Sequence, residues 1–84
     1  MESVNSIISM ARISGTKQEC YNRLRAYFPH LSIEKGKNTI RVEELTFAPQ
    51  VLPTETAWVE LYFRNDNRFV GARKYSWGEL ENMV

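Results

Sequence analysis

The fold is decided by residues 57–75, which read AWVELYFRNDNRFVGARKY. Two runs rich in β-branched and aromatic residues flank Asp66 and Asn67, and these two residue types tolerate the left-handed backbone of a tight hairpin turn. A two-residue turn at these positions predicts five facing pairs: Trp58 with Tyr75, Glu60 with Arg73, Leu61 with Ala72, Tyr62 with Gly71, and Phe63 with Val70. The opposite charges of Glu60 and Arg73 favour this register. A three-residue turn, Asn65-Asp66-Asn67, is the alternative, and it would place Phe63 opposite Phe69 and Glu60 opposite Ala72.

The predicted hairpin has two different faces, because side chains alternate between the two sides of a strand. One face is apolar and consists of Val59, Leu61, Phe63, Val70 and Ala72. The other face carries the candidate partner-binding residues Trp58, Tyr62, Phe69, Arg73 and Tyr75. Aromatic residues and arginine dominate the hot spots of protein interfaces. We therefore expect this second face to be either a binding surface or a second packing layer.

Two helices are predicted before the hairpin. The first follows helical spacing through Val4, Ile7, Ile8 and Ala11, and Ser14-Gly15 ends it. Thr16 and Glu19 form a capping box, which starts a second helix that runs to about Phe28 and stops at Pro29. The apolar stripe of this second helix consists of Cys20, Leu24, Tyr27 and Phe28.

A first hairpin is predicted over residues 31–42. It pairs Ile33 with Ile40 and Leu31 with Val42 across the polar link Lys35-Gly36-Lys37-Asn38. Leu45 and Phe47 continue the alternation if Glu43-Glu44 forms a bulge.

Residues 48–56 predict a loop that two prolines stiffen. Val51 and Leu52 form its apolar tip and are further candidate binding residues. After the second hairpin, Ser76 and Glu79 form another capping box, which opens a C-terminal helix with Leu80 and Met83 as its expected buried positions.

The predicted elements make one small domain, residues 1–84, because a chain of this length has no room for two cores. Their order is α-α-β-β-β-β-α. We expect an α+β fold in which an antiparallel sheet of three to four strands is covered on one face by two to three helices. A hydrophobic content of 43% with 25% charged residues is typical of a globular protein rather than a disordered one.

The net charge is only +1, but the charges are segregated along the chain. Residues 1–41 sum to +4, residues 42–63 to −4 and residues 64–75 to +3. A basic set in the first block consists of Lys17, Arg23, Arg25, Lys35 and Lys37. This distribution fits either a mixed, solvated surface or a surface that steers a charged partner.

The chain carries little catalytic or metal-binding chemistry. Its single cysteine, Cys20, lies on an apolar helical stripe, and its single histidine, His30, follows about 15 Å further along the chain at the rise of a helix, so we do not expect a catalytic pair. One cysteine and one histidine also exclude a disulfide scaffold and the four-ligand zinc patterns. We expect a non-enzymatic protein without cofactor or metal. The lack of a long apolar run and of a signal sequence predicts a cytoplasmic protein with no membrane partner.

Two resemblances bear on function. The order of helix, strands and helix in the later half resembles double-stranded-RNA-binding domains, in which a basic cluster at the start of the last helix binds phosphates. Here Arg73-Lys74 precede Ser76, whereas Glu79 and Glu81 occupy the last helix. The four residues 70–73, Val-Gly-Ala-Arg, run into a capped helix and resemble a stretch of the small phage anti-CRISPR proteins.

The leading functional prediction is a non-enzymatic binding module. Small chains without recognisable catalytic chemistry are often phage or mobile-element proteins, so we expect an inhibitor or adaptor that docks on a host protein or protein–nucleic-acid complex. One alternative is a nucleic-acid-binding domain that uses Arg23, Arg25, Lys35, Lys37 and Arg73 on phosphates and stacks aromatic rings on bases. The other alternative is a structural homodimer with the aromatic face as its two-fold interface.

Overall fold

The computed structural model describes residues 3–44 and 54–82, with side chains up to residue 79. The predictions for Leu45, Phe47, Val51, Leu52, Leu80 and Met83 lie outside this description. The described elements are α1 (Val4–Ile13), α2 (Lys17–Tyr27), β1 (Leu31–Lys35), β2 (Thr39–Glu44), β3 (Thr56–Phe63), β4 (Phe69–Ser76) and α3 (Trp77–Asn82).

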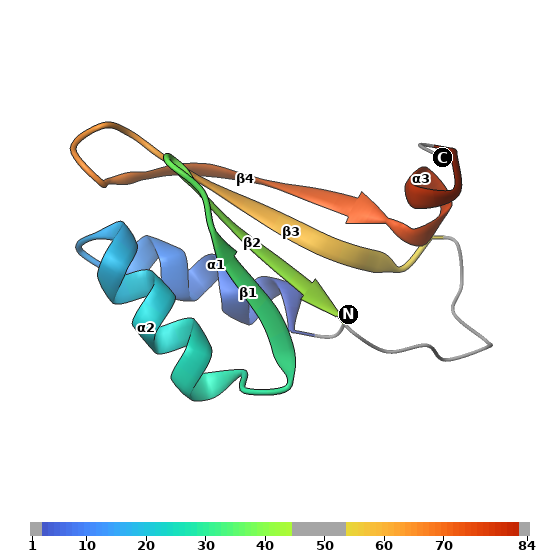
Figure 1. Ribbon diagram of the computed structural model, residues 1–84, viewed down its shortest axis with the longest axis horizontal. Helices are drawn as coiled ribbons and strands as arrows, with labels where there is room; N and C mark the ends of the chain where they lie inside the picture. The colour runs from blue at the N-terminus through green and yellow to red at the C-terminus, as the bar shows by residue number, and fades with distance from the viewer. Residues whose placement is uncertain (1–2, 45–53, 83–84) are drawn as a thin grey trace.

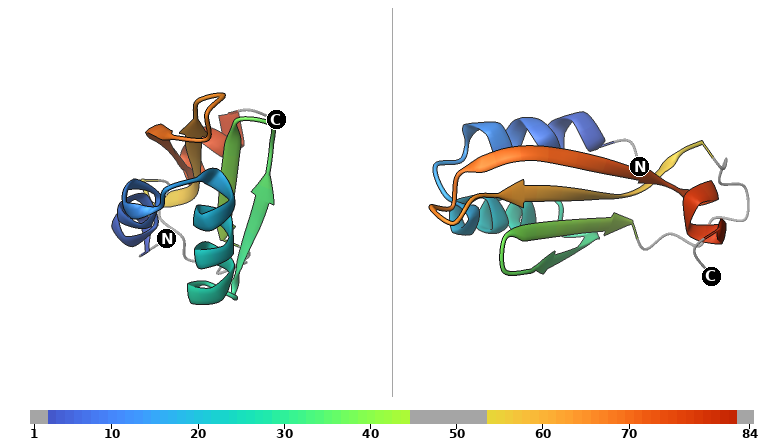
Figure 2. Two further views of the ribbon diagram at one scale, coloured as in Figure 1. Left: turned by 90° about the vertical axis from the view of Figure 1, so that its left-hand side faces the viewer. Right: turned by 90° about the horizontal axis from the view of Figure 1, so that it is seen from above.

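The four strands form one antiparallel sheet in the order β1-β2-β3-β4 (Figure 1). Helices α1 and α2 pack on the same face of the sheet, as the side view in Figure 2 shows, while α3 lies at the far end of the β3–β4 hairpin. The predicted α+β class and element order are confirmed. Four strands separate α2 from α3, so the match to the double-stranded-RNA-binding order, which has three, does not hold.

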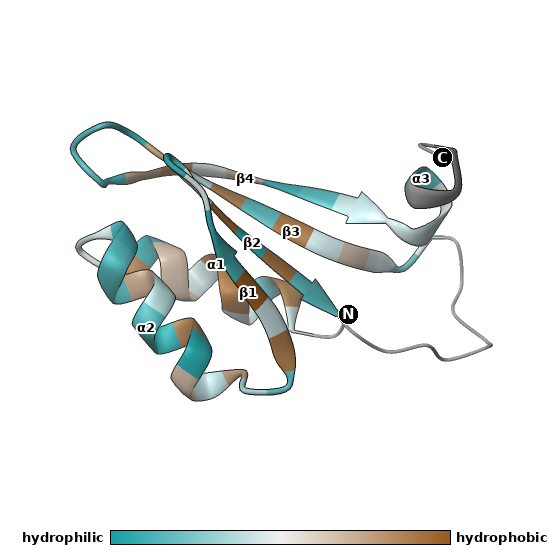
Figure 3. Ribbon diagram, viewed as in Figure 1, coloured by the Kyte–Doolittle hydropathy of each residue, from teal (hydrophilic) through white to brown (hydrophobic). Residues whose placement is uncertain are grey.

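The core lies between this sheet face and the two helices. Apolar and polar residues alternate along β2 and β3 (Figure 3), which sends one set of side chains toward the helices. The residues that are 0% exposed in this core are Ile7, Ala11, Cys20, Leu24, Ile40, Val42, Val59 and Leu61. Tyr27 was expected here and is instead 69% exposed, whereas Phe28, predicted on the same stripe, packs against the core.

The predicted capping box forms in full at α3, whereas at α2 only the bond to the Thr16 hydroxyl forms as predicted. At α2 the Glu19 N–H donates to Thr16 Oγ1 at 3.1 Å, and the Glu19 carboxylate accepts from the Gly15 N–H, one residue before the cap, at 3.0 Å. At α3 both reciprocal bonds are present, since Glu79 N–H donates to Ser76 Oγ and Ser76 N–H donates to the Glu79 carboxylate. Each box satisfies backbone N–H groups that have no partner within the helix.

The register of the β3–β4 hairpin is the predicted one over most of its length, with Trp58 facing Tyr75 and Glu60 facing Arg73. The turn differs from the two-residue prediction. Arg64 N–H donates to Arg68 O at 2.8 Å, and Asn67 adopts a left-handed conformation with φ 68°, which closes the three-residue turn Asn65-Asp66-Asn67. A bulge next to the turn then restores the predicted register.

This bulge changes the side on which two residues lie. Phe63 faces Phe69 rather than Val70, and their rings meet edge to face with centroids 5.8 Å apart. Phe69 therefore packs against the core and not on the aromatic face, which corrects its assignment as a candidate binding residue. Val70, predicted on the apolar face, is 57% exposed. Ala72 faces Leu61 as predicted but is exposed on the outer strand.

The predicted register of the first hairpin is wrong by two residues. Ile33 pairs with Val42 and Lys35 with Ile40, because Gly36 N–H donates to Thr39 O and leaves only Lys37-Asn38 as the turn. A shift of two residues keeps every side chain on its own face, so the predicted core residues remain in the core. The predicted bulge at Glu43-Glu44 is also wrong, since both residues continue the regular pairing of β2.

Candidate functional site

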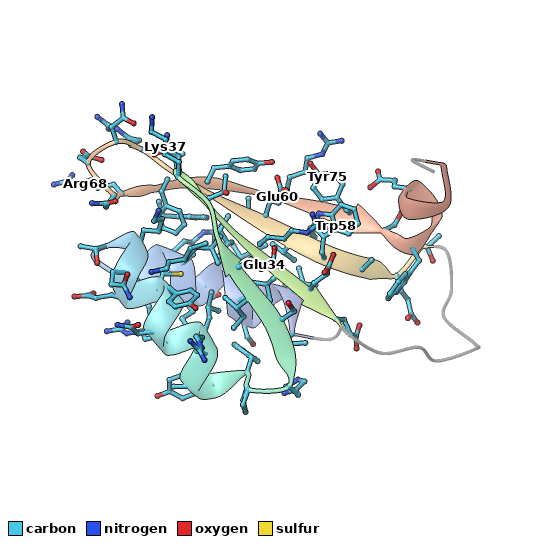
Figure 4. All side chains as sticks on the ribbon, in the orientation of Figure 1. Glu34, Lys37, Trp58, Glu60, Arg68 and Tyr75 are labelled. Carbon is cyan, nitrogen blue, oxygen red and sulfur yellow. The ribbon has the colours of Figure 1, made fainter. Side chains whose placement is uncertain are left out.

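The face of the sheet opposite α1 and α2 is the candidate site, and we call it the helix-free face. The strand register assigns to it Ser32, Glu34, Thr39, Arg41, Glu43, Trp58, Glu60, Tyr62, Gly71, Arg73 and Tyr75. Figure 4 looks onto this face and shows Trp58 and Tyr75 side by side above β3 and β4. The predicted candidates Trp58, Tyr62, Arg73 and Tyr75 are thus brought together.

Four of these side chains stack across three strands as a ladder in which two stacked rings lie between two cations. The Arg73 guanidinium carbon lies 4.6 Å from the centroid of the Tyr75 ring, and the Tyr75 and Trp58 ring centroids are 4.6 Å apart at an angle of 25°. The Arg41 guanidinium carbon lies 4.2 Å from the Trp58 ring on the other strand. Stacked rings and cation–π contacts both stabilise such an arrangement. We call these four residues the arginine–aromatic ladder.

Trp58 is buried within this ladder and only 3% exposed. Its Nε1 and the Nε of Arg41 are buried donors without an acceptor in the structure described for residues 3–44 and 54–82. An unpaired buried donor lowers stability. Trp58 therefore packs beneath the surface of this face, as a residue of a second packing layer does. Tyr62 and Tyr75 are half-buried and Arg73 is exposed, so these three residues form the accessible part.

The charged groups on the face are arranged differently from the prediction. Glu60 and Arg73 face each other, but the Glu60 carboxylate accepts a hydrogen bond of 2.7 Å from the Tyr62 hydroxyl while Arg73 stacks on Tyr75. No ion pair joins Glu60 to Arg73 in the part of the chain that the structure describes. The hydrogen bond to the Glu60 carboxylate, followed by contact with Tyr75 and burial, raises the pKa of Tyr62.

The sequence interpretation missed Arg41 and Glu43. These two residues form an ion pair on β2, and Arg41 is the outer rung of the ladder. A signal was present, because the alternation with Ile40 and Val42 places Arg41 on the side away from the core. The sequence did not show that β2 lies beside β3, and so it did not show that Arg41 lies next to Trp58.

The basic set does not join the helix-free face. Lys17 Nζ donates to the carbonyl oxygens of Gly36 and Lys37 at 2.7 and 2.8 Å, so it clamps α2 to the β1–β2 turn. Lys35 and Arg25 both contact the ring of Tyr21, at 4.5 and 5.6 Å from its centroid. Lys17, Arg23 and Arg25 belong to α2, which packs on the opposite face of the sheet from Arg73, and Lys35 at the end of β1 faces Ile40 on that same side.

The groups with catalytic potential lie apart from this face. Cys20 is 0% exposed, and burial raises the pKa of its thiol to about 11 against smaller opposing effects of Ser14 and Arg23. His30 is exposed and makes an edge contact with the Phe28 ring. Within the described ranges, His, Cys, Asp and Glu side chains do not gather in groups of three that could hold a metal ion.

Comparison of the chain with protein families, with curated proteins and with solved structures found no match. Among the described residues, no helix has the length and apolar character that a membrane span requires.

Proposed function

We propose that this protein is a non-enzymatic binding module, an inhibitor or adaptor whose helix-free face docks on a protein partner. The arginine–aromatic ladder is the observation that supports this proposal. It places Arg73 and Tyr75 at the surface with a buried Trp58 beneath them. Arginine, tyrosine and tryptophan are the residue types that carry most binding energy in protein interfaces.

Stacking also holds these side chains in one conformation before any partner arrives. Arg73 is fixed on Tyr75, Tyr75 on Trp58, and Tyr62 is tied to Glu60 by its hydroxyl. A side chain that is already ordered loses less conformational entropy on binding. The face therefore favours recognition of a surface with a fixed arrangement of polar groups.

The experiment uses the glycine on this face. A Cβ at Gly71 would meet nothing within 4 Å, so Gly71→Trp adds bulk above the face without a clash. Ala26→Trp is the matched control, because Ala26 is exposed on α2 and the added bulk is the same. We expect affinity capture from the native host, read by mass spectrometry, to recover a protein with wild type and with Ala26→Trp but not with Gly71→Trp.

Two results would contradict the proposal. One is the recovery of the same proteins by all three baits while circular dichroism shows all three folded. The other is a wild-type dimer in size-exclusion chromatography that Gly71→Trp converts to a monomer, which would make the occupant of the face a second copy of this chain.

A further inference from the structure

The outer edge of β4 is a second surface next to the helix-free face. β4 is eight residues long and is the last strand of the described sheet, in which it pairs with β3. Every second residue of such a strand directs its N–H and C=O away from the sheet. The view from above in Figure 2 shows no further strand beside β4, while α1 runs alongside it.

The side chains along this edge carry one sign of charge. Arg73 and Lys74 are exposed on opposite sides of β4, which contains no acidic residue, while the Nε of Arg68 just before the strand lies 4.0 Å from the Asp66 carboxylate. The other outer strand, β1, carries both Glu34 and Lys35. Like charges that face each other across strands are destabilising, so two copies of β4 repel each other. An acidic strand would instead bring opposite charges next to the cations of β4, which is stabilising.

Two further features favour an incoming strand. Val70 presents an exposed apolar side chain on β4, which a side chain of the partner can cover. The empty space around Gly71 leaves room for a partner side chain beside Tyr62. Strand addition at an exposed sheet edge draws affinity from main-chain hydrogen bonds and specificity from such alternate side-chain contacts.

We propose that β4 accepts an extended acidic segment of the protein partner as a fifth strand of the sheet. This inference rests on the proposed function, because it names the element of the partner that makes contact. Carboxylates at alternate positions of the segment lie beside Lys74, which faces Val59 on the helix-covered side, and its apolar residues lie on the other side of the strand, beside Gly71. Charge complementarity at the edge then selects the partner and raises the rate of association.

The test uses a labelled, terminally blocked peptide of alternating glutamate and valine, as long as β4. Peptides with glutamine or lysine in place of glutamate are the comparison. By fluorescence anisotropy at low salt, we expect the glutamate peptide to bind about tenfold more tightly than the glutamine peptide and the lysine peptide not to bind.

Matched variants locate the binding site on the protein. Lys74→Glu should weaken binding of the glutamate peptide about tenfold, whereas Lys37→Glu, the same charge change at the exposed β1–β2 turn, should change it less than about twofold. Amide hydrogen exchange should slow at alternate residues of β4 on peptide addition and stay unchanged in α2.

Equal binding of the glutamate and glutamine peptides, equal effects of the two charge reversals, or unchanged exchange in β4 would each overturn strand addition. So would an oligothymidine that binds more tightly than the glutamate peptide and is equally sensitive to Lys74→Glu, since the edge would then recognise phosphates. Capture of a host protein by the Lys74→Glu variant but not by the Gly71→Trp variant would support the proposed function and contradict only the strand-addition inference. If the peptide binds but affinity capture recovers no host protein that depends on Gly71, the result would contradict only the proposal that the helix-free face docks on a partner.

Discussion

The two faces of the sheet bury their side chains by different means. On the helix-covered face, Val59 and Leu61 are 0% exposed because aliphatic residues of α1 and α2 cover them. On the helix-free face, Trp58 reaches 3% exposure between a tyrosine and an arginine of the same sheet. The first face needs other elements of the fold for its cover, whereas the second is covered largely by its own side chains.

This difference has a functional consequence. A face that is closed by stacked rings and guanidinium groups presents ordered polar atoms to solvent and stays soluble without a helix above it. An aliphatic face of the same area would have to be covered by another element or by a second chain. The helix-free face therefore needs no covering helix to shield its apolar surface from solvent.

The largest expected effect is on the helix-covered face. Leu61→Ala should lower the free energy of unfolding by about 3–5 kcal/mol, because Leu61 is fully enclosed and the change leaves a cavity. Urea denaturation measures this loss. Tyr62→Ala, at the neighbouring residue on the other face, is the control and should cost clearly less. Equal losses for the two variants would remove the distinction between the faces.

Trp58→Ala should cost less than Leu61→Ala, about 2–3 kcal/mol. The ring is buried, but the space it leaves opens to solvent on the helix-free face, so no enclosed cavity remains. Trp58→Phe keeps a ring under Tyr75 and removes the unpaired Nε1 donor, and it should cost little. If urea denaturation shows Trp58→Ala to be the more destabilising of the two alanine variants, the helix-free face is a second core layer.

Titration of Tyr62 separates its environment from that of the other tyrosines. Its pKa is raised in the folded protein, mainly by the hydrogen bond to Glu60, so the folded state keeps this proton at a pH where the unfolded chain, with a tyrosine pKa of about 10, has lost it. The stabilisation is fully present below about pH 10 and is lost as the pH rises toward the folded-state pKa.

Ultraviolet absorbance of tyrosinate follows this titration. The last of the tyrosine transitions should disappear in Tyr62→Phe and move to lower pH in Glu60→Gln, because the neutral amide no longer favours the protonated phenol. An unchanged late transition in Tyr62→Phe would assign the raised pKa to another tyrosine.

The smallest effect concerns Glu60 and Arg73. A double-mutant cycle at low salt should give a coupling of about 0.2 kcal/mol or less, because each side chain is engaged elsewhere although the two residues face each other. The Arg41 and Glu43 pair is the control, and it should show a larger coupling because its ion pair is formed. A coupling of about 1 kcal/mol between Glu60 and Arg73 would show that they pair in solution.

Features set by neighbouring residues in the chain could be predicted. The caps at Thr16 and Ser76 form because each connects backbone and side-chain groups within one turn. The facing of Trp58 with Tyr75 followed from a short turn and alternating side chains. These predictions placed Trp58, Tyr62, Arg73 and Tyr75 on one face without knowledge of the other strands.

The errors arose where one residue more or fewer changes the geometry at little energetic cost. The three-residue turn and its bulge moved Phe69 into the core, and the short turn at Lys37-Asn38 shifted the first hairpin by two residues. Asn65, Asp66 and Asn67 all tolerate a left-handed backbone, so the local sequence is compatible with both a two-residue and a three-residue turn. Packing of Phe69 against Phe63 and of Ile33 beside Val42 is consistent with the register that formed.

The sequence by itself determined the order of the elements, the residues that begin α2 and α3, and which side chains share a face away from the turns, because these depend on periodicity and on contacts within a few residues. Only the tertiary structure decided that β2 lies beside β3, that Arg41 closes the ladder over Trp58, and that Trp58 is buried while Arg73 is exposed. Burial and cross-strand stacking depend on which strand becomes the neighbour, and that choice is made by the packing of the whole core rather than by any local pattern.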